Sequence, residues 1–194
     1  MSSYNEPRII RETSAGMVCY SIRDEMLTHR EIELIGEVNS ESVNSLISQI
    51  RYLAREEPGK EITVYINSPG GEVSSGLALY DVMKAVKCPI RTVCVGTAAS
   101  MGAVLFAAGD QRDMLPHARV MIHDPLISHT GGSALNLKTI SDSLMHTREI
   151  TGRILAEHTG RTLEEIYEKT ATDSYFYARE AVEFGLADRI INEI

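Results

Sequence analysis

Residues 91–109, RTVCVGTAASMGAVLFAAG, contain an apolar β-branched run, a turn of small residues and an apolar helical segment. The run IRTVCVG (90–96) predicts a strand, and SMGAVLFAAG (100–109) predicts a helix. The same order recurs along the chain, with strands expected at 31–36, 61–71 and 118–125 and helices at 40–57, 73–86, 137–158 and 162–170. For the helix at 40–57, Ser40 is the expected cap. Strands that alternate with helices in this way indicate one α/β domain with a largely parallel sheet.

Composition and charge narrow the class of protein. The 194 residues carry a formal net charge of -8 without a basic stripe, which argues against a nucleic-acid partner. Cys19, Cys88 and Cys94 lie in or beside apolar runs, so we expect buried thiols in a reducing compartment rather than disulfides. The N-terminus lacks a signal-peptide core, and no apolar run approaches the roughly 18 residues of a membrane span. We therefore expect a cytoplasmic protein without a membrane partner, whose first twenty-odd residues form a mobile or partner-dependent arm.

Ser100 lies where a predicted strand turns into a predicted helix, among Ala, Gly and Met residues. Free backbone N–H groups at a helix start favour developing negative charge, which predicts a nucleophile with part of an oxyanion hole. The alternative is that Ser100 only caps a buried helix. A second turn, NSPGG (67–71), also ends a strand, and parallel strands bring their carboxyl ends to one crevice. Its alternative is an ordinary strand-to-helix turn.

A serine nucleophile needs a base, and His123 is the best candidate among the six histidines. It follows the β-branched run RVMI and precedes Pro125, which places it at a strand end on the crevice side. A structural role at the strand end is the alternative for His123. The patterns place His146 and His158 in helices, and His117 and His129 in turns.

The sequence pattern does not decide which acid orients such a histidine. The downstream candidates are Asp124, Asp142, Asp173 and Asp188. Asp124 adjoins His123, but neighbouring strand residues point to opposite faces, so its side chain is expected to point away. Asp173 lies between two helical stretches, where it either turns inward or caps a helix. The order Ser, His, Asp excludes the chymotrypsin, subtilisin and α/β-hydrolase groups, and Ala98 breaks the G-x-S-x-G pattern.

Several stretches together resemble a known family over about residues 7–191. They are YINSPGGEV, GLALYDVM, GTAASMGAVLFAAG, LPHARVMIHDPL and AREAVEFGLAD. With them the chain resembles the ClpP family, the peptidase subunits of the ATP-dependent Clp protease. The resemblance implies a crotonase-like α/β fold, a superhelix of ββα units with a projecting handle helix. It also implies a single domain over 1–194, with an axial arm at about 1–22 and a handle region at about 126–158.

The resemblance further implies a serine endopeptidase with the triad Ser100, His123 and Asp173. The backbone N–H groups of Gly71 and Met101 would form its oxyanion hole. Neither a metal nor a small-molecule cofactor is implied, because ATP is consumed by a separate AAA+ unfoldase of the ClpX, ClpA or ClpC type. Heptameric rings would stack in pairs as a homo-oligomeric tetradecamer and enclose unfolded protein substrates.

Some positions depart from the family pattern. Asp124 replaces the Gln that usually follows the catalytic His, and Ala171 and Thr172 replace an Asp-Arg pair that helps couple ring stacking to the triad. The segment LISHTGGSALN (126–136) replaces a stretch rich in Gly and Gln. The alternative function is therefore a divergent ClpP paralogue that acts mainly as a structural or regulatory ring subunit with an active second isoform. A crotonase-type acyl-CoA enzyme is a further rival, although it needs no serine nucleophile.

Overall fold

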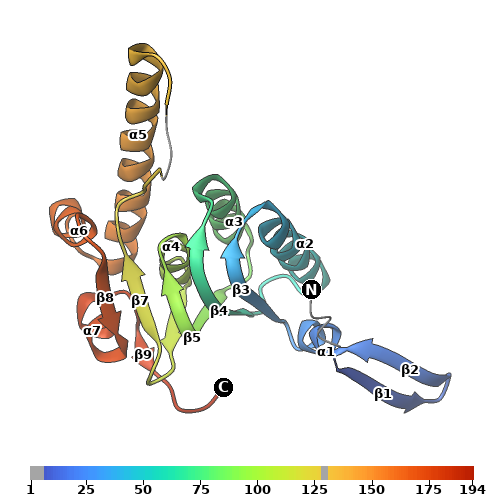
Figure 1. Cartoon of the computed structure of the whole chain (residues 1–194). Coiled ribbons are helices and arrows are strands. Elements are labelled where there is room, and N and C mark those ends of the chain that lie inside the picture. The colour runs from blue at the N-terminus through green and yellow to red at the C-terminus, as the bar shows by residue number, and fades with distance from the viewer. Residues whose placement is uncertain (1–6, 128–130) are drawn as a thin grey trace.

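The computed structural model describes residues 7–127 and 131–194, whose helices and strands are arranged as Figure 1 shows. The strands in these ranges are β1 (Arg8–Thr13), β2 (Gly16–Ser21), β3 (Glu31–Val38), β4 (Ile62–Gly71), β5 (Ile90–Ala99), β6 (Gln111–Met114), β7 (Arg119–Ile122), β8 (Ser174–Tyr177) and β9 (Arg189–Ile190). The helices are α1 (Ile22–Thr28), α2 (Ser40–Glu56), α3 (Val73–Ala85), α4 (Met101–Ala107), α5 (Ala134–Thr159), α6 (Leu163–Thr170) and α7 (Ala178–Phe184). Within the described ranges, no helix is long and apolar enough to cross a membrane.

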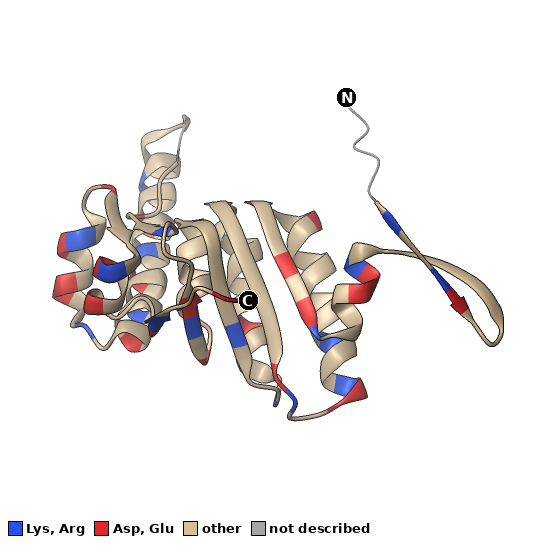
Figure 2. Ribbon diagram, turned by 90° about the horizontal axis from the view of Figure 1, so that it is seen from below, with Lys and Arg blue, Asp and Glu red and all other residues tan. Residues whose placement is uncertain are grey.

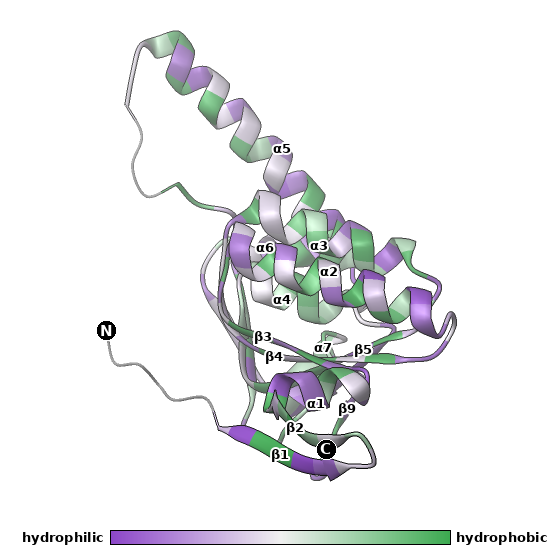
Figure 3. Cartoon of the chain, turned by 90° about the vertical axis from the view of Figure 1, so that its right-hand side faces the viewer, coloured by the Kyte–Doolittle hydropathy of each residue, from purple (hydrophilic) through white to green (hydrophobic). Residues whose placement is uncertain are grey.

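A seven-stranded sheet forms the centre of the fold, with the order β3–β4–β5–β6–β9, β7 beside β5 and β8 beside β7. Every neighbouring pair is parallel except β7 and β8. β5 has two partners on one side, because residues 91–94 pair with β6 and residues 97–99 pair with β7. Helices α2, α3 and α4 cover one face of the sheet, and α1 lies on the opposite side with the β1–β2 hairpin (Figure 3). The predicted α/β architecture with a largely parallel sheet is confirmed.

Helix α2 shows how the apolar pattern builds the core. Its buried residues recur at helical spacing: Val43, Leu46, Ile50 and Leu53. The cap is Asn39, whose side chain accepts hydrogen bonds from the backbone N–H groups of Glu41 and Ser42. The prediction that Ser40 caps this helix is wrong by one residue, because Asn39 is the last extended residue and Ser40 already belongs to the helix.

The N-terminal region contains regular structure that the sequence analysis does not predict. β1 and β2 form an antiparallel hairpin from Arg8↔Ser21 to Thr13↔Gly16, which projects away from the sheet (Figures 1 and 2). Most of its side chains are exposed, with 66% of Ile10 and 70% of Met17 accessible, so no alternation of buried and exposed residues marks the strands. The first part of the predicted arm, residues 1–6, lies outside the described residues.

The three cysteines differ in their surroundings. Cys88 and Cys94 are buried free thiols, as expected, and burial raises the pKa of Cys94 to about 11. Cys19 is exposed, so the expectation of a buried thiol is wrong there. Its apolar neighbours belong to the projecting hairpin, in which most residues are exposed.

Helix α5 leaves the body of the fold over its first half (Figure 1). It contains 26 residues, three more at its start than the predicted 137–158, because Ser133 caps it by accepting a hydrogen bond from Asn136 N–H. Its buried residues all lie in the second half: Thr151, Gly152, Ile154 and Leu155. Part of the predicted handle region, residues 128–130 with His129, lies outside the described residues.

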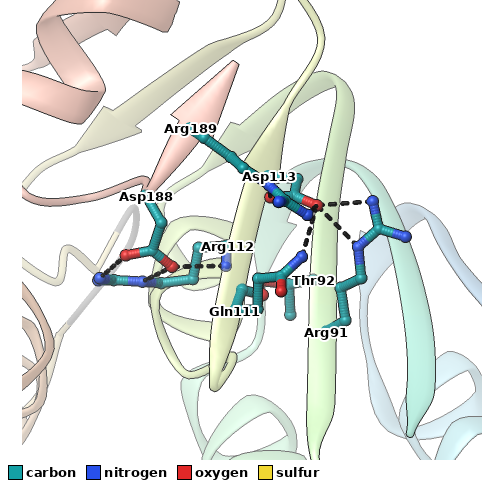
Figure 4. Close-up of polar contacts among 7 residues, drawn as sticks. All are labelled: Arg91, Thr92, Gln111, Arg112, Asp113, Asp188 and Arg189. Carbon is teal, nitrogen blue, oxygen red and sulfur yellow. Dashed lines mark hydrogen bonds and ion pairs between the residues drawn. The ribbon is translucent and has the colours of Figure 1, made fainter. Parts of the chain in front are cut away.

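A buried carboxylate holds the C-terminal strand β9 against β6 (Figure 4). The Asp113 side chain is 0% exposed and accepts hydrogen bonds from Arg91 Nε at 2.7 Å, Arg189 Nε at 2.7 Å and Gln111 Nε2 at 2.9 Å. Burial by itself raises the pKa of Asp113, but these hydrogen bonds outweigh burial and lower the pKa below the ordinary 3.8. The carboxylate is therefore stabilised as the charged form in the folded chain.

Replacing Asp113 with Asn is expected to lower the free energy of unfolding by about 2–3 kcal/mol at neutral pH, because two guanidinium groups lose their charged acceptor. Since the pKa of Asp113 is lower in the folded state, its stabilisation is present above 3.8 and is lost as the pH falls below that value. Urea unfolding between pH 7 and pH 3 measures both effects. Asp142→Asn is the control, because its exposed pair with Lys138 is worth at most about 0.5 kcal/mol. A D113N protein as stable as the parent at pH 7 would contradict the prediction.

Candidate active site

Ser100 joins the end of β5 to the start of α4 in a strained backbone conformation. Its φ of 53° and ψ of -122° are unfavourable for a residue with a side chain, and its N–H donates to Met121 O at 2.8 Å. Ser100 occupies the cap position of α4 but makes no side-chain cap hydrogen bond. The interpretation of Ser100 as a simple helix cap is therefore wrong.

The Ser100 hydroxyl instead contacts His123. The distance from Ser100 Oγ to His123 Nε2 is 2.8 Å, and the distance from His123 Nδ1 to Asp173 Oδ1 is 3.3 Å. The strand pairing explains this arrangement: His123 follows Ile122 at the end of β7, and Asp173 precedes Ser174 at the start of β8. Because Ile122 and Ser174 are the last partners of this antiparallel pair, the two flanking residues leave the sheet side by side.

The other candidate acids have different partners. Asp124 binds Arg148 and Thr170, as its predicted direction away from the serine requires. Asp142 pairs with Lys138 on the outside of α5, and Asp188 pairs with Arg112 beside β6 (Figure 4). Asp173 precedes a strand, so its interpretation as a helix cap is wrong. Of the four aspartates, Asp173 is the one that contacts His123.

His117, His146 and His158 lie away from this contact. His146 is exposed on α5, and His117 lies in the turn before β7. His158 is half-buried near the end of α5, with its Nε2 at 3.2 Å from the Tyr80 hydroxyl. Burial lowers the pKa of His158. The predicted placement of these three residues in a turn or in helices is confirmed.

The two Gly-rich turns meet at the serine. A Cβ atom on Gly70 would lie 2.6 Å from Ala99 O, 2.7 Å from Ser100 Cβ and 3.0 Å from Met101 N. A Cβ atom on Gly71 would lie 2.2 Å from Val38 O. Both glycines have positive φ, 93° and 150°, so the approach of Gly70 to the serine turn and of Gly71 to β3 requires residues without side chains. Met101 is the first residue of α4, where backbone N–H groups have no acceptor within the helix.

An open apolar groove of about 530 Å³ lies between the start of α3, the chain after β7 and helix α5. Its apolar lining residues are Val73, Pro125, Leu126, Ile127, Ile140 and Leu144. A small cleft beside it contains Ser100 and His123 and shares Val73 and Pro125 with the groove. An apolar surface therefore begins next to the reactive atoms. In the described ranges, no group of three or more His, Cys, Asp or Glu side chains is placed to hold a metal ion.

The geometry and the comparison with known families agree on the class of protein. A hydroxyl, an imidazole and a carboxylate in contact in this order are the arrangement that serine hydrolases use. The family model described as Clp protease matches residues 14–194. The chain therefore belongs to the Clp protease family, which implies a serine peptidase of the ClpP type. The resemblance to ClpP and the predicted crotonase-like fold class are confirmed.

Proposed function

We propose that this chain is a serine endopeptidase subunit that hydrolyses unfolded polypeptides, with Ser100 as nucleophile, His123 as general base and Asp173 as the orienting acid. The observation that carries the proposal is the pair of contacts at His123, 2.8 Å to the serine hydroxyl and 3.3 Å to the carboxylate. A histidine held between these groups accepts a proton at one ring nitrogen while the other nitrogen stays bound to the acid.

In this mechanism Ser100 Oγ attacks the peptide carbonyl carbon and its proton moves to His123 Nε2. Asp173 stabilises the imidazolium that forms, and the N–H groups of Gly71 and Met101 would bind the developing oxyanion. The tetrahedral intermediate then breaks its C–N bond, and the Nε2 proton leaves with the amine. A water molecule attacks the resulting ester, gives its proton to His123 and releases the acid product, after which the proton returns to Ser100.

Sequestration in a barrel would supply substrate selection. We propose heptameric rings that stack as a tetradecamer through the projecting half of α5, which exposes Leu135, Leu137 and Met145. Exposed apolar side chains of this kind are stabilised when a partner covers them. An AAA+ unfoldase would consume the ATP and deliver unfolded chains, whose apolar side chains match the groove beside Ser100.

A ring subunit that depends on an active second isoform is the alternative function. The observation that favours it lies immediately before Asp173, where Ala171 and Thr172 are exposed and carry no charge to pair with a neighbouring ring. In this alternative, homomeric rings would stack weakly, and the triad would work only in mixed assemblies.

Labelling with a fluorophosphonate probe tests the proposal, measured together with particle mass by light scattering and with hydrolysis of a fluorogenic peptide. We expect one label per chain, mapped to Ser100, together with hydrolysis by the assembled particle. Ser174→Ala is the matched control, since that hydroxyl donates to Lys169 O and should not label. Labelling at Ser100 that appears only after a second isoform is added would favour the alternative. An absence of labelling in every assembly state would refute the peptidase proposal.

A further inference from the structure

Three side chains that line the same cleft as Ser100 and His123 form a cluster, which we call the Asp124 latch: Asp124, Arg148 and Thr170. The Asp124 carboxylate accepts hydrogen bonds from Arg148 Nε at 2.6 Å and from Thr170 Oγ1 at 2.6 Å. The Asp124 backbone N–H also donates to Thr170 O at 2.8 Å. The Asp124 carboxylate is therefore bound to both α5 and the end of α6, and the Asp124 backbone N–H is bound to the end of α6.

The latch joins the two segments that carry the imidazole and the carboxylate. Asp124 follows His123 directly, and Thr170 lies three residues before Asp173. The β7–β8 ladder ends at Ile122 and Ser174, so it stops one residue short of His123 and one residue short of Asp173. Beyond the ladder, the hydrogen bonds between Asp124 and Thr170 provide the next connection between these segments.

A second contact, with the ring of Tyr167, also holds the Arg148 side chain in place. Its guanidinium carbon lies 3.6 Å from the centre of the Tyr167 ring, a cation–π contact between α5 and α6. Gly152 makes room for this ring, because a Cβ atom there would lie 2.8 Å from Tyr167 Cε1. The Arg148 and Asp124 side chains are 23% and 33% exposed, so their charge-assisted hydrogen bond is partly shielded from water.

We propose that Asp124 and Arg148 are positioning residues, which hold His123 and Asp173 at the separation at which the carboxylate orients the imidazole and stabilises the imidazolium; the proposal rests on the function proposed above. Neither residue contacts Ser100, and each acts through the backbone on either side of the His123–Asp173 contact. Because a displacement of about 1 Å can cost about 10²-fold in rate, loosening the latch should slow the chemical step. Arg148 lies on α5, so a displacement of this helix would reach the triad through the latch.

The test compares Arg148→Met with Arg148→Lys in the full chain. Fluorophosphonate labelling counts the active sites, and peptide hydrolysis then gives kcat per labelled site and KM. For R148M we expect complete labelling, an unchanged KM and a fall of about 10-fold in kcat per site. R148K keeps the charge and should recover part of kcat, although it lacks the planar group that stacks on Tyr167. Arg153→Met is the matched control, since it removes the exposed pair with Glu149 on the same helix.

The outcomes separate positioning from structural support. A fall confined to the labelled fraction or to the particle mass, with unchanged kcat per site, assigns the latch a structural role and overturns the proposal. An R148M protein within twofold of the parent, or an R153M protein with the same loss as R148M, also overturns it. If the parent chain itself does not label at Ser100, the proposed peptidase function has failed, and the positioning proposal fails with it.

Discussion

Replacing Ser100 with Ala is expected to reduce hydrolysis of a fluorogenic peptide by at least about 10³-fold, because the acyl-enzyme can no longer form. The remaining groups, the His123–Asp173 pair and the backbone amides, lack the atom that attacks the peptide. Rates of purified S100A and parent protein, measured at the same particle mass, check this expectation. Retention of more than about a tenth of the parent activity would remove Ser100 from the mechanism.

The same position offers an independent measurement on stability. Ser100 has a φ of 53°, which glycine adopts without the strain imposed by a side chain. Ser100→Gly should therefore be more stable than S100A by about 1 kcal/mol, although both variants are inactive. Urea unfolding at one fixed protein concentration compares the two. A less stable S100G would mean that the backbone at this turn is not strained.

Replacing Gly70 with Ala is expected to reduce activity by about 10²-fold or more without changing a triad side chain. The new Cβ atom would lie 2.6 Å from Ala99 O and 2.7 Å from Ser100 Cβ, so the serine turn has to move. The φ of 93° adds strain of its own, and we expect a loss of roughly 2–4 kcal/mol in the free energy of unfolding. Peptide hydrolysis and urea unfolding measure the two effects.

Gly59→Ala is the control that separates the effect of backbone strain at Gly70 from the effect of its contact with the serine turn. Gly59 has a similar φ of 86°, but a Cβ atom there would meet nothing within 4 Å. G59A should lose about 1–2 kcal/mol of stability from the backbone alone and keep its activity. If G70A is as active as G59A, the packing of the two turns does not control the position of Ser100.

The strands and helices that the sequence predicts correctly are those that bury a continuous apolar face. Helix α2 is an example, with buried residues at helical spacing, and strands β4 and β5 contain runs of consecutive buried residues. The elements that were missed bury little or are short. The β1–β2 hairpin is exposed on most of its length, and β6, β8 and β9 contain two to four residues that become strands through pairing with a neighbour.

The sequence pattern predicted some residues of the candidate site and left another open. Ser100 and His123 follow apolar runs, so their place at strand ends was visible from the pattern. Asp173 was one of several open acids by pattern, and only the resemblance to the family selected it. Its contact with His123 depends on the register of β7 and β8, which lie about fifty residues apart in the chain.

The sequence analysis did not identify Arg148 or Thr170 as residues of the site. Each residue lies on a helix with no motif around it, and they are separated from Asp124 by 24 and 46 residues. The sequence contained one indication, the Asp that stands where the family usually has Gln, but not the partners of that carboxylate. These partners are set by the packing of α5 and α6 against the end of β7.

The sequence by itself therefore determined the α/β alternation, the two Gly-rich turns and the residue types that a serine peptidase needs, because these depend on neighbours close along the chain. The local pattern left open which aspartate meets His123, and the tertiary structure brings Asp173 into this contact. Only the tertiary structure decided why Gly70 has no side chain and what holds Asp124. These features depend on contacts between segments far apart in the chain, and such contacts are set by sheet register and helix packing rather than by local pattern.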